Sequence, residues 1–464
     1  MAKEIADREW FHVIERPGSP VLGWDSNISS INPCLSKILQ VPLKVGGFLF
    51  FQNKLLVDME DHQHINDIIR EKYTENKKDI KRLCVEMEKD CDKFRNAMDK
   101  ISTEDPKSIL TFFDLHRKAI YHFRWIFNAV EIFESITQKS SELPLKQNFI
   151  TKYNISLHAI IKEIQKQKKL VDQIEKGNFD KVHNYPNISK KIKTFLKKFS
   201  WINMLHHQGK LIDFKTLMSE IRHTLNFSLP KTTKENSRTV SEDVWFLRYF
   251  IFLRTHLSES NAYADAKIKP ALEILGKKFD LKYDDITFLT EKEIITLIAK
   301  SQLDTTKEQI HNRQQNGYAC INLNNTYSFI EGQELQTLYS FYHKFSAKEK
   351  LDHITELKGI TGNKGFVIGT AKIIQNVKEF NKLNPGDILV ANSTTPNYVP
   401  IMTKAAAFLT DEGGITNHAA IISRELNKPC IVGLKHATKV FQDGDLLEVN
   451  ADDGIVKILK RNKI

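Results

Sequence analysis

The chain has 464 residues, a formal net charge of +11 at pH 7 and five scattered cysteines without C-x-x-C spacing. A chain of this length can form about three domains and bury a core that needs no covalent cross-links. The odd number of cysteines argues against a disulfide framework or a cysteine zinc site, and it favours a reducing, cytoplasmic location.

The first 58 residues predict an irregular segment that ends in a β-hairpin. The N-terminus lacks the apolar core of a secretory signal peptide. Residues 1–45 contain several turn signals, among them Pro17-Gly18 and Ser19-Pro20. Gly47–Asp58 consists of two short apolar runs around a polar turn, which is the pattern of a hairpin.

Residues 59–345 predict a helical bundle, because apolar residues recur there every three or four positions. Ser241 carries a capping signal for an aromatic-rich helix, and Thr290-x-x-Glu293 forms a capping box. The spacing lasts only a few turns in each helix, so an antiparallel bundle is favoured over a coiled coil. The main predicted helices cover residues 80–101, 115–136, 154–175, 189–204, 241–256 and 268–276.

Two stretches of this bundle raise the question of whether it binds nucleic acid or a membrane. Lys162–Lys210 contains 12 lysines against four acidic residues. Because it has no arginine and no nucleic-acid-binding motif, we interpret it as a solvated face. Trp245–Leu253, the most apolar run, is broken by Arg248 and is too short to cross a bilayer. We therefore expect neither nucleic acid nor a membrane as a partner.

Residues 346–365 are predicted to form a linker and hinge. Linker signals begin earlier, at the polar residues 311–317 and the asparagine-rich residues 322–326, and residues 340–357 resemble a charged helix. Lys358–Gly365 then has glycines at 359, 362 and 365, which is where we expect the hinge.

From residue 366 to residue 464 short strands alternate with short helices, which predicts a compact α/β domain. The predicted fold class is therefore α plus α/β, with a large, mainly helical N-terminal region that carries a short hairpin. The predicted strands cover residues 366–368, 371–374, 388–391, 407–410, 430–432, 446–449 and 455–458, and helices lie at 399–405 and 419–426.

The most informative motif is Thr410–Arg424, which indicates a strand end, a glycine turn, a histidine and a helix. Thr416 and Asn417 are plausible N-cap residues, and His418 follows in the first helical turn. The free N–H groups and positive end of a helix disfavour imidazolium and can bind an anion. A neutral imidazole beside an anion site suits a nucleophile that accepts phosphate. A histidine that merely caps or packs is the alternative.

Residues 365–454 resemble the swivelling phosphohistidine domain of the phosphoenolpyruvate-utilising enzymes, which include phosphoenolpyruvate synthase, pyruvate phosphate dikinase and rifampicin phosphotransferase. The resemblance implies that His418 carries a phosphoryl group, with Gly414, Thr416, Asn417 and Arg424 around it. Asn417 departs from the serine or cysteine of many relatives, and Arg424 could instead pair with a nearby acid. The matching pieces are Gly365–Ala371, Gly386–Val390, Thr395–Met402, Thr410–Arg424, Pro429–Gly433 and Asp443–Asp445.

The same resemblance implies a split enzyme. Relatives that make phosphoenolpyruvate carry an ATP-grasp domain and a large barrel, whereas this sequence shows no glycine-rich phosphate loop and no Walker motif. We expect a separate ATP-grasp partner that holds ATP with Mg²⁺, and neither a tightly bound cofactor nor a metal on this chain. Residues 241–300 resemble the helical segment that precedes the phosphohistidine domain in rifampicin phosphotransferase, which implies a substrate-binding bundle.

The acceptor site is the least defined part of the hypothesis. An acceptor hydroxyl needs a base and a cationic group to orient it, and the candidates are Arg254, Arg248, His206 and His122; an ordinary surface or core role remains open for each. Two classes of function remain: an enzyme subunit that phosphorylates a small molecule on the bundle, and a phosphocarrier that relays phosphate to another protein.

Overall fold

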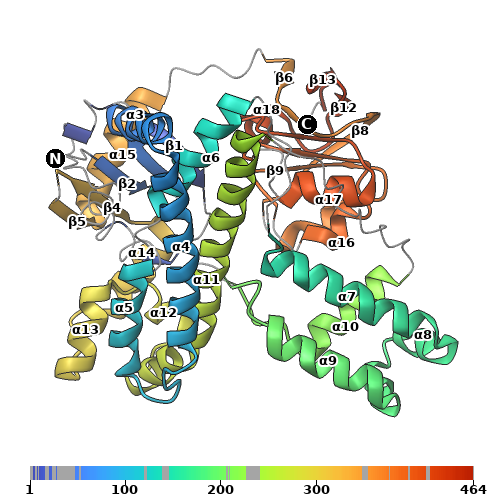
Figure 1. Ribbon diagram of the computed structural model, residues 1–464, viewed down its shortest axis with the longest axis horizontal. Coiled ribbons are helices and arrows are strands. Elements are labelled where there is room, and N and C mark those ends of the chain that lie inside the picture. The colour runs from blue at the N-terminus through green and yellow to red at the C-terminus, as the bar shows by residue number, and fades with distance from the viewer. Residues whose placement is uncertain are drawn as a thin grey trace.

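The computed structural model places the chain in two bodies, a mainly helical N-terminal part and an α/β C-terminal part (Figure 1), which confirms the predicted fold class. None of the helices in the described part combines the length and apolar character that a membrane crossing requires. The structure describes residues 4–5, 8, 10–15, 20–22, 28, 47–51, 54–119, 123–137, 146–204, 207, 209–225, 241–324, 326–346, 354–375, 377–394, 398–413 and 418–462.

A five-stranded antiparallel sheet, counted over the described residues, has the strand order β1-β3-β2-β4-β5. The hairpin predicted at 47–58 is confirmed, because β2 and β3 pair from Phe48 opposite Val57. β2 also pairs with β4, so one sheet joins both ends of the helical region. The strands are β1 (Trp10–Glu15), β2 (Gly47–Phe51), β3 (Lys54–Asp58), β4 (Ala319–Leu323) and β5 (Thr326–Ile330).

The pairing of β4 with β5 corrects the prediction of a linker at residues 322–326. Asn322 lies in β4, and Asn324 follows that strand with a φ of 50°. Asparagine adopts this left-handed conformation more readily than most residues. The tendency of asparagine to form turns was therefore visible in the sequence, but Asn324 lies between two paired strands of one sheet and not in a linker.

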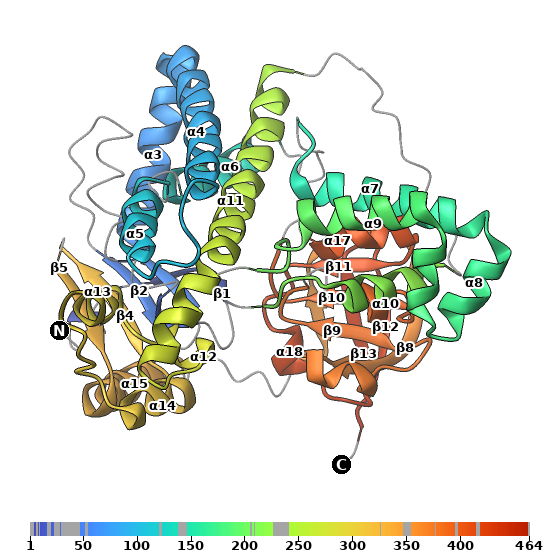
Figure 2. The ribbon, with the colours of Figure 1, turned by 90° about the horizontal axis from the view of Figure 1, so that it is seen from below.

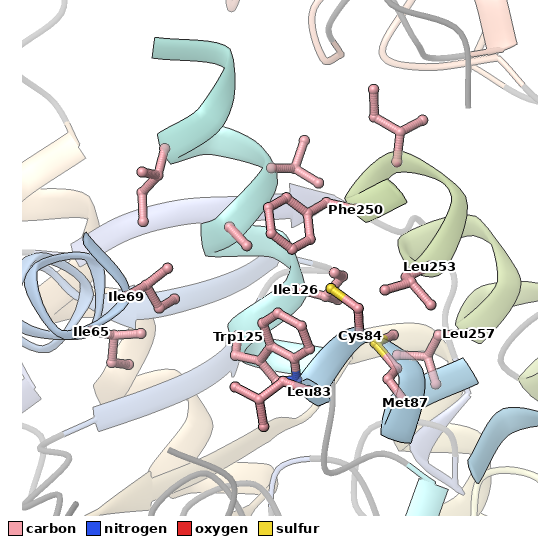
Figure 3. Packing of buried hydrophobic residues seen from close by; sticks show 14 of the residues in the cluster. Ile65, Ile69, Leu83, Cys84, Met87, Trp125, Ile126, Phe250, Leu253 and Leu257 are labelled. Atoms are coloured by element: carbon pink, nitrogen blue, oxygen red, sulfur yellow. The ribbon is translucent and has the colours of Figure 1, made fainter. Parts of the chain in front are cut away.

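Long helices pack above this sheet, and their core is built from large apolar side chains. Trp125 and Ile126 meet Cys84, Met87 and Leu253 in the centre of this core (Figure 3), and Trp125 is fully buried. The helices of this body are α3 (Met59–Glu75), α4 (Lys77–Met98), α5 (Ser108–Ala119), α6 (Phe123–Thr137), α11 (Glu242–Lys278), α12 (Tyr283–Ile286), α13 (Glu291–Lys300), α14 (Lys307–Asn316) and α15 (Gly332–Ser346).

Two helix predictions were wrong in extent. Residues 115–136 belong to two helices, α5 and α6. Residues 241–276, predicted as two helices, form the single 37-residue helix α11, which passes through Pro270. The predicted capping signals are confirmed, since Ser241 caps α11 and Thr290 forms a capping box with Glu293. The charged helix predicted at 340–357 is also wrong, because α15 ends at Ser346 and a strand follows at Glu356.

Residues 149–225 form a small helical lobe with a hydrophobic core of its own. The predicted helix 154–175 is divided in two at Lys166-Gln167. Both ribbon views place this lobe beside the C-terminal domain, on the side that carries α16 and α17 (Figures 1 and 2). Its elements are α7 (Phe149–Gln165), α8 (Lys168–Glu175), a 3-10 helix (Phe179–Asn184), α9 (Pro186–Phe199) and α10 (Phe214–Thr224).

The C-terminal domain is built on an eight-stranded sheet in the described part of the chain, with the order β6-β13-β12-β8-β9-β10-β11-β7. Strands β8 to β11 are parallel neighbours, and the remaining pairs are antiparallel. Its elements are β6 (Glu356–Lys358), β7 (Ile360–Asn363), β8 (Phe366–Ile373), β9 (Ile388–Ala391), α16 (Val399–Met402), β10 (Ala407–Thr410), α17 (His418–Leu426), β11 (Cys430–Val432), α18 (Ala437–Val440), β12 (Leu446–Asn450) and β13 (Ile455–Lys460).

The segment Lys358–Gly365, predicted to be a hinge, contributes to both edges of this sheet. β6 pairs with β13 and β7 pairs with β11. A Cβ atom on Gly359 would lie 2.6 Å from the Val432 oxygen, and one on Gly362 would lie 2.9 Å from the Cys430 sulfur. These glycines permit close packing, and a hinge in this segment stays a prediction. Residues 347–353 of the predicted linker lie outside the described residues.

Candidate functional site

The candidate site lies where the parallel strands β9 and β10 end side by side. Because carboxyl ends of parallel strands meet at one edge of a sheet, the segments that follow them become neighbours. The Asp411 N–H donates to the Ala391 oxygen (3.1 Å), and the Glu412 N–H donates to the Asn392 oxygen (2.9 Å). The pairing of the two strands therefore continues into the turn that leads to His418.

Asp411 connects this turn to α18 through hydrogen bonds. Its buried carboxylate accepts hydrogen bonds from the backbone N–H of Thr438 (3.1 Å) and from the Thr438 hydroxyl, so it fastens the turn to α18. Burial raises the pKa of Asp411, although the bonds from Thr438 oppose that shift. The turn itself contains Gly413, with a φ of 111°, a conformation that suits glycine.

His418 is the first residue of α17, and its ring has one defined partner. The Thr394 hydroxyl oxygen lies 2.9 Å from Nδ1 of His418. Thr394 follows β9 and is buried, whereas His418 remains partly exposed to solvent. The protein atoms around the imidazole are nevertheless sufficient to lower its pKa to about 4 by burial. His418 is therefore neutral at pH 7.

The contact with Thr394 engages Nδ1, and the reactive nitrogen depends on which of the two groups donates the hydrogen bond. A hydroxyl can accept or donate, and the tautomer of a histidine is set by the bond that one of its nitrogens makes. If Nδ1–H donates to Thr394, the lone pair lies on Nε2. A neutral imidazole with an available Nε2 lone pair is a nucleophile that needs no base to remove a proton first.

The helix that begins at His418 is packed tightly against the sheet. Ala419 and Ala420 are fully buried, and a Cβ atom on Gly362 would lie 3.1 Å from the Ala420 Cβ. The Asn363 amide donates to the Lys428 oxygen (2.9 Å) and thereby holds the end of α17 to β7. The orientation of α17, and with it the position of His418, is set by the sheet.

The structure describes only some of the predicted phosphoryl-binding residues. Gly414, Thr416 and Asn417 lie outside the described residues, so their roles stay predictions. Arg424 lies on α17, where its Nε donates to the Ala420 oxygen of the same helix (3.0 Å). Burial lowers the pKa of Arg424 below its ordinary value. Its predicted contact with a phosphoryl group is likewise untested.

The predicted acceptor residues are not brought together at one described place. Arg248 and Arg254 lie on α11, whereas His122 and His206 lie outside the described residues. The Arg254 guanidinium lies 5.8 Å from the centroid of the Phe127 ring. Its pKa is lowered by burial, and the Glu134 carboxylate acts in the opposite direction. In the described part of the chain, no group of three or more His, Cys, Asp or Glu side chains is arranged to hold a metal ion.

Thr394 is the site residue that the sequence analysis missed. The motif there was taken to start at Thr395, which lies outside the described residues. Tyr398, from the same motif, packs its ring against Phe380 with centroids 4.9 Å apart, and its hydroxyl donates to the Ile374 oxygen at 3.4 Å. A partial signal for Thr394 was available, since it lies three residues after the predicted strand 388–391. The structure shows that this strand is the parallel neighbour of the strand before His418.

Comparisons with known proteins converge on this domain. Residues 383–454 match the family model "PEP-utilising enzyme, mobile domain". The chain is 48% identical over 117 residues to a probable phosphoenolpyruvate synthase from Archaeoglobus fulgidus, which covers 24% of this chain and 16% of that protein. It is 40% identical over 127 residues to the phosphoenolpyruvate synthase of Pyrococcus furiosus, covering 27% of this chain and 16% of that protein.

A third relative is the uncharacterized phosphotransferase YvkC of Bacillus subtilis, which is 39% identical over 104 residues, covering 22% of this chain and 12% of that protein. The matched stretch is thus less than a fifth of each of these relatives. The matched family segment contains Thr394, Asp411, His418 and Arg424. Residues 383–454 of this chain therefore match the mobile domain of PEP-utilising enzymes, and the relatives named above share sequence with only about a quarter of the chain.

Proposed function

We propose that this chain is the phosphotransferase subunit of a split dikinase, in which His418 carries the phosphoryl group. In this proposal ATP is held with Mg²⁺ by a separate ATP-grasp partner, and a small molecule bound on the helical part receives the phosphoryl group. The observation that carries the proposal is the neutral His418 imidazole whose Nδ1 lies 2.9 Å from the Thr394 hydroxyl. That arrangement prepares Nε2 as the nucleophile.

The proposed first step is an attack of His418 Nε2 on phosphorus. A bond forms between Nε2 and phosphorus while the bond from phosphorus to the leaving oxygen breaks. The imidazole then carries a positive charge, and Nδ1–H still donates to the Thr394 hydroxyl oxygen. The positive end of the nine-residue helix α17 lies next to the phosphoryl oxygens and stabilises their negative charge. Phosphoryl transfer depends mainly on such positioning and charge neutralisation.

Delivery to an acceptor requires the domain to move as a unit. β6, which begins at Glu356, already pairs with β13 in the sheet of this domain. We therefore propose that a pivot for the whole domain lies before Glu356. The helical lobe α7–α10 lies next to the side of the domain that carries α16 and α17 (Figure 1). In this arrangement, we propose that His418 faces the acceptor part of the molecule.

The decisive experiment is phosphoryl labelling of the purified chain. We expect His418→Ala to abolish incorporation from ATP, labelled separately at the β- or γ-phosphate, when the candidate ATP-grasp partner is present. The label on the unaltered chain should be acid-labile and base-stable, as a phosphoramidate is. His64→Ala, which changes an exposed histidine on α3, is the matched control and should label normally.

Two outcomes would change the proposal. Label retained by His418→Ala would move the nucleophile to another residue. Label that enters from phosphoenolpyruvate and passes on only to a second protein would favour the phosphocarrier over the kinase, because no small-molecule acceptor would then be used.

A further inference from the structure

Arg95 lies near the end of α4 and is surrounded by three aromatic rings from three other parts of the chain. Its guanidinium carbon is 3.7 Å from the ring centroid of Phe149, 4.7 Å from that of Tyr263 and 5.1 Å from that of Trp201. Phe149 begins α7, Trp201 follows α9 and Tyr263 lies on α11. The guanidinium therefore lies where the helical lobe meets the main helical body.

The Arg95 guanidinium is incompletely hydrogen-bonded within the part of the chain that the structure describes. Its Nη1 is buried and makes no hydrogen bond, and no carboxylate forms an ion pair with it among the described residues. Buried guanidinium groups are normally paired. Arg313 shows the usual arrangement in this protein, since it binds the carboxylates of Glu293 and Glu331. Arg95 is stacked against rings but lacks such partners.

The nearby carboxylates are engaged elsewhere. Glu259 accepts the N–H groups of Phe149 (2.9 Å) and Ile150 (2.8 Å) at the start of α7. Asp92 lies 3.2 Å from the His256 ring, and Asp99 pairs with Lys267 at 2.8 Å. Burial raises the pKa of Glu259 to about 7, so its negative charge is incomplete at neutral pH. Burial lowers the pKa of Arg95 and these three carboxylates oppose that shift from a distance, but none of them forms an ion pair with Arg95 among the described residues.

The position of this cluster also suits a ligand. Arg95 is partly exposed, so one side of its side chain can be reached from solvent. In both ribbon views the start of α7 lies next to α11, on the side of the C-terminal domain that carries α16 and α17 (Figures 1 and 2). α17 begins with His418. The cluster therefore lies in the part of the molecule that faces the helix of the proposed nucleophile.

We propose that Arg95, Phe149, Trp201 and Tyr263 form a binding site for a small aromatic or conjugated acid. The carboxylate of the ligand pairs with the Arg95 guanidinium, whose planar fork matches carboxylate oxygens. The planar part of the ligand packs against the surrounding rings. If the proposed function holds, this acid is the phosphoryl acceptor, and that identification rests on the proposed function; the binding itself does not.

Binding is tested on the full chain with benzoate and 1-naphthoate as probes, without ATP or a partner protein. Fluorine NMR of protein labelled with 5-fluorotryptophan reports on Trp201, whose signal is assigned with Trp201→Phe. We expect both acids to shift the Trp201 signal in a saturable way, and benzamide, which has the same ring but no charge, to bind at least tenfold more weakly.

Arg95→Gln should weaken binding of 1-naphthoate at least tenfold, whereas Arg82→Gln should leave it unchanged. Arg82 is an exposed residue of the same helix that pairs with Glu86, so it controls for the general loss of a positive charge. No shift of the Trp201 signal in the unaltered protein, or equal affinity for benzoate and benzamide, would overturn the proposal, whether or not Arg95→Gln folds. Because no phosphoryl transfer is measured, a failure of His418 labelling leaves this result intact.

Discussion

His418 and Arg95 are both partly exposed, potentially cationic side chains, but their surroundings differ. His418 lies on a turn held by backbone hydrogen bonds that continue a sheet, with one polar partner at a defined ring nitrogen. Arg95 is stacked against three rings from separate parts of the chain, and its Nη1 has no hydrogen-bond acceptor among the described residues. We propose that the first arrangement serves chemistry, because a neutral imidazole keeps a lone pair, and that the second serves recognition, because the Arg95 Nη1 has no acceptor among the described residues.

The largest effect within this comparison is expected at Thr394. Thr394→Val removes the hydroxyl that orients His418 while preserving the shape of the side chain. A hydrogen bond to a charged group contributes about 1.5–3 kcal/mol, so the rate of His418 labelling should fall about 10- to 100-fold. Thr394→Ser should restore most of the rate. Single-turnover labelling measures both variants, and an unchanged rate in Thr394→Val would show that Thr394 does not select the reactive nitrogen.

The next largest effect is expected on the local stability of α17, which packs against the sheet at Gly362. Gly362→Ala places a methyl group 2.9 Å from the Cys430 sulfur and 3.1 Å from the Ala420 Cβ. Overpacking of this kind costs about 1–3 kcal/mol. We expect hydrogen-exchange protection of α17 and β7 to decrease by that amount.

Gly386→Ala is the control for Gly362→Ala. A Cβ atom on Gly386 would meet no atom within 4 Å, and its φ of 92° makes backbone strain the only cost. Its effect should stay outside α17. Equal loss of protection at α17 in both variants would mean that close packing at Gly362 does not position the helix of His418.

The smallest effect is expected from a change of pH near neutrality on the rate of His418 labelling. Burial lowers the pKa of His418 from 6.5 to about 4, so the unfolded chain binds more protons than the folded one between those values. Folding stability should therefore decrease as the pH falls from about 6.5 to 4. The labelling rate should change less than about twofold between pH 7 and 8, where the imidazole is neutral. A rate that rises steeply through pH 7 would show that His418 titrates there.

The parts of the fold that could be predicted are those in which local pattern and tertiary environment agree. The predicted strands 388–391, 407–410 and 430–432 match β9, β10 and β11 at both ends, because short apolar runs between turn residues are typical of buried parallel strands. The helix after His418 was predicted for a similar reason. In the helical part, periodicity identified helices but misjudged where they break.

The parts that could not be predicted depend on distant partners. The glycines of Lys358–Gly365 suggest a hinge when read alone, but they are needed because Val432, Cys430 and Ala420 approach closely in the folded domain. Pro270 predicts a break, yet α11 continues through it. Arg95 could not be predicted at all, because its aromatic neighbours come from positions 149, 201 and 263, and no local pattern joins them.

The pairing of β2 with β4 has a further consequence for how this molecule was assembled. Gly47 of β2 lies opposite Leu323 of β4, so the chain enters the helical body from β3 and returns to the same sheet at β4, with β2 between these two strands. The helices between β3 and β4 thus form an insertion into one small sheet. The α7–α10 lobe, which has its own hydrophobic core, is a second insertion within the first. An insertion of this kind can be exchanged or enlarged without disturbing the strands at its base. The C-terminal domain can therefore be kept while the helical part diversifies.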